Sequence, residues 1–190
     1  MEWYADLVMT GDKWEPDGEL PEFSVGYLRC TAVDLTRGES APEVLDALSA
    51  DLEVFCPAFD GNDVTEEIQD QFEAPLFGVL ALEVAEIASP FRGRGLGVWL
   101  AAEVIARLAP YPGTLVLGYP QHFGPPFPGV SSAAAVRKLR RHWRRVGLEP
   151  LRGAPQLLGQ STDRRCFDRA RARARSVVKG LSFTVDPKAA

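Results

Sequence analysis

Residues 92–97 read RGRGLG and stand between two apolar segments. The preceding segment, residues 75–88 (PLFGVLALEVAEIA), is interrupted only by Glu83 and Glu86, which is typical of a strand buried on both faces. The following segment, residues 97–109 (GVWLAAEVIARLA), is apolar almost all round and predicts a helix lying against a sheet. The glycines therefore lie where a buried strand becomes a buried helix.

The glycine-rich turn predicts an anion site. A helix that begins here leaves its first backbone N–H groups without intrahelical acceptors, and Gly93, Gly95 and Gly97 carry no side chains that would cover them. The positive end of the helix dipole and the charges of Arg92 and Arg94 add to the attraction for phosphate. A tight turn that binds no ligand is the alternative interpretation.

The rest of the chain predicts an α/β fold. Residues 22–35 are typical of a strand, and residues 39–55 of an amphipathic helix that opens with a capping box, Ser40 and Glu43. The apolar face expected for that helix consists of Val44, Leu48, Leu52 and Phe55. Further along we expect a short helix within 64–72, strands at 113–120, 148–151 and 155–159, a loop at 121–130, and helices at 131–147 and 163–178.

Composition narrows the class of protein. The chain has 190 residues, no apolar run of membrane-spanning length and no basic N-terminal lead, so we expect a folded cytoplasmic protein without a membrane partner. Three scattered cysteines and two histidines favour neither a disulfide framework nor a metal site. An excess of Arg over Lys, 17 to 4, among many Ala and Gly residues is typical of a high-GC bacterial coding bias.

Charge is distributed unevenly along the chain. Residues 1–136 contain 6 Lys/Arg and 22 Asp/Glu, whereas residues 137–179 contain 14 Lys/Arg and 3 Asp/Glu. Such a segment is typical either of a nucleic-acid-binding face or of a region that neutralises the acidic half across the fold. We favour neutralisation, and the whole-chain pI of about 5.1 argues in the same direction.

The turn does not fit the common nucleotide motifs. No Lys-Ser or Lys-Thr follows it, as a P-loop needs, and Val98 stands where a dinucleotide fingerprint has glycine. Arg92-x-x-Gly95-x-Gly97 instead resembles the coenzyme A motif of the GNAT superfamily of N-acetyltransferases, Gln/Arg-x-x-Gly-x-Gly/Ala. Residues 141–151 (RHWRRVGLEPL) are similar to that family's second signature, which falls here at 142–149 in degenerate form.

The resemblance covers residues 76–152 and implies a fold. GNAT domains have a mixed, mostly antiparallel, twisted sheet flanked by helices, with the fourth and fifth core strands splayed apart. We expect one such domain over residues 1–180 and a C-terminal tail at 181–190.

The resemblance also implies acetyl-CoA as the cofactor. Main chain at Ile87, Ala88 and Ser89 would pair with the pantetheine arm. The diphosphate would bind to the turn, which consists of Arg92, Gly93, Arg94, Gly95, Leu96 and Gly97.

Glu83 is the first candidate for the general base and Glu86 the second. A carboxyl buried on this strand would have a raised pKa and could take a proton from an ammonium group. The alternative for either glutamate is exposure at a bulge or a salt bridge to a basic helix.

The general acid departs from the family pattern, because Trp143 stands where the family commonly has a proton-donating tyrosine, and an indole N–H cannot serve in that way. Tyr119, His122, or water with the helix dipole could replace it. Trp143 is expected in the core, because it shares a helical stripe with Leu139 and Val146.

His122 and Phe123 in the Pro/Gly loop are candidates for binding the acceptor, a small-molecule or peptide amine. The expected function is therefore acetyl transfer from acetyl-CoA to a primary amine. Two alternatives stay open, a non-catalytic CoA-binding domain and a tRNA-directed acetyltransferase toxin. A homodimer is also left open.

Overall fold

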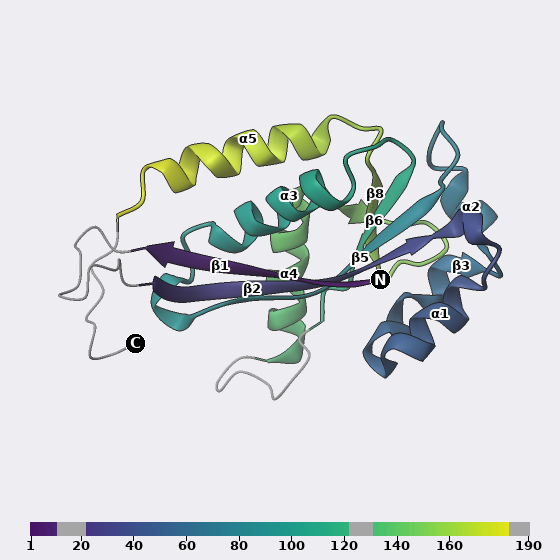
Figure 1. Ribbon diagram of the computed structural model, residues 1–190, viewed down its shortest axis with the longest axis horizontal. Coiled ribbons are helices and arrows are strands. Elements are labelled where there is room, and N and C mark those ends of the chain that lie inside the picture. The colour runs from purple at the N-terminus through teal and green to yellow at the C-terminus, as the bar shows by residue number, and fades with distance from the viewer. Residues whose placement is uncertain (11–21, 122–130, 183–190) are drawn as a thin grey trace.

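The computed structural model describes residues 1–10, 22–121 and 131–182, and it contains a six-stranded sheet in the order β1-β2-β5-β6-β8-β7 (Figure 1). Neighbouring strands are antiparallel except β5 and β6, which run parallel. The predicted mixed, mostly antiparallel sheet is therefore confirmed. The strands are β1 (Glu2–Thr10), β2 (Glu22–Asp34), β5 (Gly78–Ile87), β6 (Thr114–Gly118), β7 (Glu149–Pro150) and β8 (Leu158–Ser161), with a separate two-stranded sheet of β3 (Phe59–Asp60) and β4 (Asp63–Val64).

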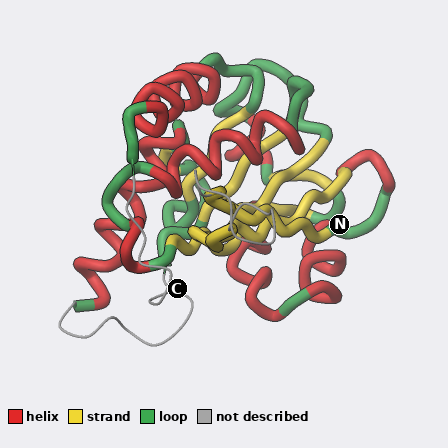
Figure 2. Tube along the Cα trace, turned by 60° about the vertical axis from the view of Figure 1, so that its left-hand side comes forward, coloured by secondary structure: helices red, strands yellow, loops and turns green. Residues whose placement is uncertain are grey.

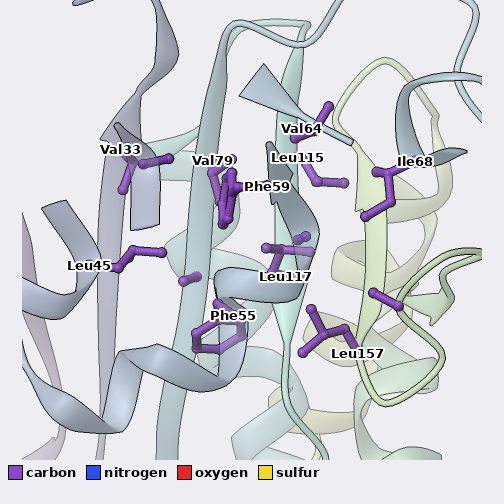
Figure 3. Close-up of a cluster of buried hydrophobic side chains, with 14 of the residues drawn as sticks. Val33, Leu45, Phe55, Phe59, Val64, Ile68, Val79, Leu115, Leu117 and Leu157 are labelled. Carbon is purple, nitrogen blue, oxygen red and sulfur yellow. The ribbon is translucent and has the colours of Figure 1, made fainter. Parts of the chain in front are cut away.

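Helices cover both faces of the large sheet (Figure 2). One face packs against α3 (Leu96–Leu108), α4 (Ser132–Val146) and α5 (Cys166–Lys179). The other packs against α1 (Ala41–Leu48), the 3₁₀ segment η2 (Ala50–Ala58) and α2 (Glu66–Gln69). Two further 3₁₀ turns are η1 (Leu35–Arg37) and η3 (Ser89–Phe91). Figure 3 shows the second core, which includes Val33, Leu45, Phe55, Val79, Leu115 and Leu117.

The prediction of a single helix over residues 39–55 is wrong, because the segment forms α1 and η2. Helix α1 ends at Leu48, because Ser49 is extended and its hydroxyl accepts a hydrogen bond from the Asp51 amide at the start of η2. Ser40 is the N-cap as predicted, but its side chain makes no capping hydrogen bond. The buried face of α1 also differs from the predicted one, because Leu45 is fully buried whereas Leu48 is 45% exposed.

The other helices follow the predicted pattern. Helix α4 begins after Ser131, whose hydroxyl accepts from the Ala134 amide, and ends at Gly147 in the left-handed conformation. Trp143 is 3% exposed and Val146 is fully buried, which confirms the core role expected for both. None of the helices in the described ranges has the length and apolar character that crossing a bilayer requires.

The two parallel strands separate part of the way along β5. Their last paired residues are Leu82 and Gly118, yet β5 continues to Ile87, and among the described strands only β2 pairs with this last part. This opening is the splay that the sequence analysis predicted between the two central strands. It places Glu83 and Tyr119 at the first position beyond the last pair, one on each side.

Candidate functional site

Glycine is required at the three positions of the turn for two different structural reasons. Gly93 and Gly95 have φ angles of 79° and 82°, in the left-handed region that residues with a side chain rarely adopt. Gly97 lies within α3, and a Cβ atom there would lie 2.9 Å from Cε1 of His142. Chain geometry and helix packing therefore account for the glycines even before a ligand is considered.

The turn also exposes hydrogen-bond donors in the way that an anion site needs. Gly95 is the N-cap of α3 and has no side chain to cap the helix. Throughout the described ranges, the amides at the start of this helix find no acceptor, namely those of Gly93, Gly95, Leu96 and Gly97. With the helix dipole, these amides form a site that favours a phosphate group.

The two arginines of the turn differ in position. Arg92 turns back toward β5, where its Nε donates to the Ile87 carbonyl at 2.6 Å and its terminal nitrogen lies 3.8 Å from a Glu86 oxygen. Arg94 is exposed to solvent. Arg92 thus already holds a main-chain group that was expected to pair with pantetheine.

The neighbouring main-chain groups are also engaged within the protein. The Ala88 amide donates to the Val25 carbonyl at 2.8 Å, and the Ser89 carbonyl accepts from the Arg92 amide at 3.3 Å. Pairing of this segment with an extended ligand therefore requires some of these bonds to be exchanged. The role of Ile87, Ala88 and Ser89 stays a prediction.

Glu83 is the extra residue of a β-bulge. The register pairs Arg29 with Val84 and Cys30 with Leu82, so Glu83 has no direct partner on β2. Bulges commonly redirect a side chain next to a functional site. Here the bulge lies beside the opening between β5 and β6.

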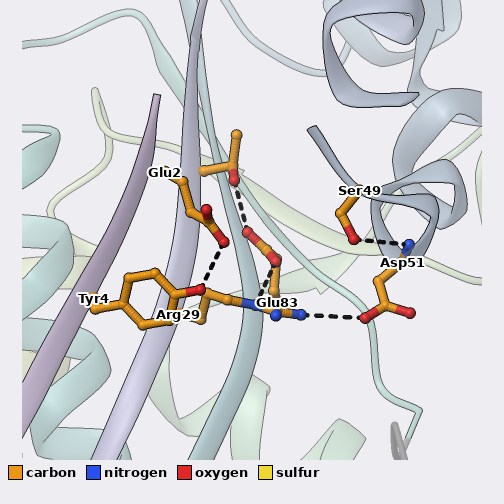
Figure 4. A network of polar contacts seen from close by, with 7 residues as sticks. Glu2, Tyr4, Arg29, Ser49, Asp51 and Glu83 are labelled. Carbon is orange, nitrogen blue, oxygen red and sulfur yellow. Dashed lines mark hydrogen bonds and ion pairs between the residues drawn. The ribbon is translucent and has the colours of Figure 1, made fainter. Parts of the chain in front are cut away.

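Glu83 is 3% exposed, and its side chain contacts two residues of β2 (Figure 4). The Thr31 hydroxyl donates to one carboxylate oxygen at 2.7 Å, and Nε of Arg29 forms an ion pair with the other at 2.8 Å. Arg29 also reaches Asp51 of η2 at 3.2 Å. The expected burial of Glu83 is therefore confirmed, whereas neither alternative is observed, because the residue is not exposed at the bulge and its ion pair is to a strand arginine rather than to a basic helix. Its role as general base stays a prediction.

Burial raises the pKa of the Glu83 carboxyl above its usual range, although the Thr31 hydrogen bond and the Arg29 charge act in the opposite direction. A carboxylate with a raised pKa is a better proton acceptor than an exposed one. Glu83 thus has the burial and the proton affinity that the sequence analysis expected of a general base.

Glu86 lies in a different environment, and the burial expected for it is wrong. Its side chain is 54% exposed, and it lies four residues beyond Leu82, where pairing with β6 ends. The Tyr27 hydroxyl of β2 donates to it at 3.3 Å, and Arg92 lies close by. Glu86 therefore belongs to the exposed surface beside the turn.

Tyr119 follows the last residue of β6 and packs, partly buried, against the same core as Ala81 and Leu117. Its hydroxyl donates to the Gln121 side chain. Because Ala81 and Glu83 share a side of β5, Tyr119 and Glu83 open onto the same face of the sheet. The other two predicted residues, His122 and Phe123, lie outside the described residues.

His142 was missed by the sequence analysis. Its ring packs against Gly97 and meets Trp143 edge to face, with ring centroids 5.1 Å apart. Burial, with a contribution from the Arg145 charge, lowers the pKa of His142 to about 4, so the imidazole is neutral at pH 7. Its Nε2 is buried and has no hydrogen-bond partner among the described residues. The spacing of residues could have predicted that His142 is buried, because it lies on the same face of the helix as Leu139 and Val146.

Comparison with known proteins gives a faint structural likeness. No protein-family model and no curated protein matches the sequence. Among solved structures, Arabidopsis thaliana NAA60 in complex with acetyl-CoA is 12% identical, with a TM-score of 0.40 over 80% of this chain and 72% of that one. The same Arabidopsis protein with a bisubstrate analogue is 11% identical, with a TM-score of 0.41 over 79% and 70% of the two chains. A likeness at this level carries no argument about what this chain binds.

Proposed function

We propose that this protein is an N-acetyltransferase that uses acetyl-CoA to acetylate a primary amine. One observation carries the proposal: the opening between β5 and β6 has a buried carboxyl at its edge, and β5 leads from there to a turn with uncapped amides. The first feature suits deprotonation of an amine, and the second suits a diphosphate. The sequence resemblance at 92–97 and 142–149 supports the same interpretation.

The turn is the proposed cofactor site, because its amides and arginines fit a diphosphate. The amides from Gly93 to Gly97 would bind the phosphate oxygens, with Arg92 and Arg94 adding charge-assisted hydrogen bonds. Acetyl-CoA, when bound, supplies an acetyl group activated as a thioester. Movement of Arg92 toward phosphate would also release the Ile87 carbonyl, which it holds in this structure.

Glu83 is the proposed general base. An acceptor amine is protonated at neutral pH and must lose a proton before it can attack a carbonyl carbon. Arg29 and Thr31 orient the Glu83 carboxylate, and Asp51 in turn anchors Arg29. The carboxylate would take the proton directly or through a water molecule.

Tyr119 is the proposed general acid, because it ends the strand on the other side of the opening. Trp143 is buried in the core and its indole cannot supply a proton. His142 is neutral and can offer only a weakly acidic N–H group.

Transfer of the acetyl group through a cysteine thiolate is unfavourable, because burial raises the pKa of Cys30, the cysteine beside the bulge, to about 12. Direct transfer to the amine therefore fits these residues best.

The surface beside Glu83 favours a cationic acceptor. Glu2, Asp6 and Glu86 are all exposed. In the strand register, Glu2 and Asp6 lie on the same face of the sheet as Thr31 and Tyr27, their partners on β2. Carboxylates gathered on one face attract a protonated amine before it is deprotonated. A small amine or the amino group of a peptide meets this condition.

The cofactor site can be tested with a matched pair of glycine variants. Gly95→Val should abolish the rise in melting temperature that acetyl-CoA causes in the wild type, because the side chain strains the turn and covers its amides. Gly38→Val is the control, because Gly38 is also left-handed, at φ 74°, but follows η1. The control should lose basal stability yet keep the response to acetyl-CoA. No response of the wild type to acetyl-CoA would refute the proposal.

A non-catalytic CoA-binding domain is the second candidate, favoured by the buried Trp143 at the position where the family has tyrosine. A thiol-release assay with polyamines, amino acids and peptides separates the two. Release of free thiol that depends on an amine supports the enzyme. Stabilisation by acetyl-CoA without release for any amine supports the binding domain.

A further inference from the structure

A row of arginines on α4 lines a groove away from the proposed active site. The side chains recur at intervals of three, four and seven residues, so they lie on one face of the helix. The groove has a volume of about 430 Å³, and an apolar patch from β7 and β8 completes it. Its lining residues are Arg137, Arg140, Arg141, Arg144, Pro150 and Leu158.

These arginines have few partners within the protein. Arg144 forms an exposed ion pair with Glu149 at 3.0 Å, and Arg140 donates to the Pro155 carbonyl at 2.7 Å. Arg137 and Arg141 are exposed, and within the described ranges no carboxylate lies within 4 Å of either. The Nε of Arg140 is buried and has no hydrogen-bond partner in the same part of the chain.

The arginines of α4 therefore do not form the ion pairs that were expected to neutralise the acidic half of the chain. In the described residues, the basic segment reaches the acidic half by ion pairs at one carboxylate, Glu103, which binds Arg171 and Arg175 of α5. Of the four arginines in the row, only Arg144 has a carboxylate partner within the described ranges. In a protein with net charge −5, such a row concentrates positive potential on one face.

We propose that this groove binds a nucleic-acid strand through its phosphates, a function beyond the proposed acetyl transfer. Arg137 and Arg144 are seven residues apart, about 10 Å along the helix axis, and guanidinium groups one turn apart suit the regular repeat of phosphates along a strand. Carboxylates on an acidic peptide have no such repeat. Among the described residues, the lining of the groove includes two apolar residues, Pro150 and Leu158, and no aromatic one for base stacking, so binding through the phosphates is independent of sequence.

On α4, the groove lies on a different side of the helix from the residues that face the proposed cofactor turn and the core. His142, Trp143 and Val146 face α3 and the core, whereas the arginines face β7 and β8. Substitutions in the groove should therefore leave thiol release from acetyl-CoA unchanged. The two proposals can fail independently.

Fluorescence anisotropy with a labelled single-stranded RNA of mixed sequence tests the inference. Two to four phosphate contacts predict a slope of log affinity against log salt between about −1.4 and −2.8, a loss of about 7- to 50-fold from 50 to 200 mM salt. The double variant Arg137→Glu, Arg141→Glu should lose at least about tenfold in affinity and show a shallower slope, because two contacts become repulsive. Both side chains are exposed, so the melting temperature should change little.

The matched control is Lys138→Glu, Arg145→Glu, which makes the same charge change at exposed positions of α4 outside the groove. It should retain most of the affinity. Equal losses in the two double variants would overturn the assignment, because the effect would then follow net charge alone. The absence of RNA binding at 50 mM salt, or tighter binding of a polyglutamate peptide than of RNA, would also overturn it.

Discussion

Glu83 and Glu103 are both buried carboxyls that contact arginine, yet their proton affinities shift in opposite directions. Glu83 of β5 is 3% exposed and has one arginine, Arg29, with the Thr31 hydroxyl; burial prevails and raises the pKa. Glu103 of α3 is 6% exposed and receives two contacts from each of Arg171 and Arg175, which lower its pKa to about 2.

The difference shows how two ion pairs serve different purposes. Four charge-assisted contacts keep Glu103 ionised at every physiological pH and hold α5 against α3. That clamp also supports the turn, because the α5 residue Val177 lies about 3.5 Å from where a Gly95 Cβ would be. A single arginine leaves Glu83 able to exchange a proton. Its partner Arg29 is itself shared with Asp51.

The largest expected effect is on catalysis at Glu83. Glu83→Gln keeps the shape of the side chain and can still accept from Thr31, but it removes the proton acceptor. We expect kcat/KM for thiol release to fall by about 100-fold or more, with a small change in melting temperature.

Glu86→Gln is the matched control on the same strand, and its activity should stay within a few-fold of the wild type, because Glu86 is exposed. A Glu83→Gln enzyme of full activity would remove Glu83 from the mechanism. A loss at Glu86 equal to that at Glu83 would show that both serve the surface charge rather than proton transfer.

The turn could be predicted from sequence because its requirements are local. Left-handed backbone at Gly93 and Gly95 is a property of the residues themselves. Strand β1 was also predictable from local sequence, although it was missed. Its residues Ala5, Leu7 and Met9 alternate with more exposed residues, as in a half-buried strand.

The surroundings of Glu83 could not be predicted, because they depend on pairing between distant segments. The bulge exists only in the register of β5 against β2, whose Arg29 and Thr31 lie more than 50 residues earlier in the chain. The alternation of residues along β5 indicated which face of the sheet Glu83 lies on, but it did not predict the ion pair with Arg29. For Glu86, the apolar sequence indicated burial, whereas exposure follows from where β6 ends.

Stability should respond more at Glu103 than at Glu83. Glu103→Gln removes the charge shared by two arginines and should cost about 1–2 kcal/mol of unfolding free energy, less than a fully buried pair because those arginines are 31% and 50% exposed. Urea unfolding at pH 7 measures it, with the exposed Glu149→Gln as the control. A loss at Glu149 as large as that at Glu103 would contradict the clamp.

The smallest expected effect is on the pH dependence of the free energy of unfolding, to which Glu103 and Glu83 should contribute with opposite signs. The folded pKa of Glu103 is lowered from 4.5 to about 2, so its contribution to stability is present above pH 4.5 and is lost as pH falls toward 2. The folded pKa of Glu83 is raised, so its contribution is present below pH 4.5 and is lost as pH rises through the folded pKa.

Urea unfolding over a pH series therefore distinguishes the two residues. Relative to wild type, Glu103→Gln should become less destabilised as pH falls below 4.5, whereas Glu83→Gln should gain relative stability as pH rises above it. Parallel curves for both variants would mean that Glu83 is held ionised as firmly as Glu103. Arg29 would then act as a structural clamp, and the proton acceptor for the amine would have to be another residue at the opening between β5 and β6.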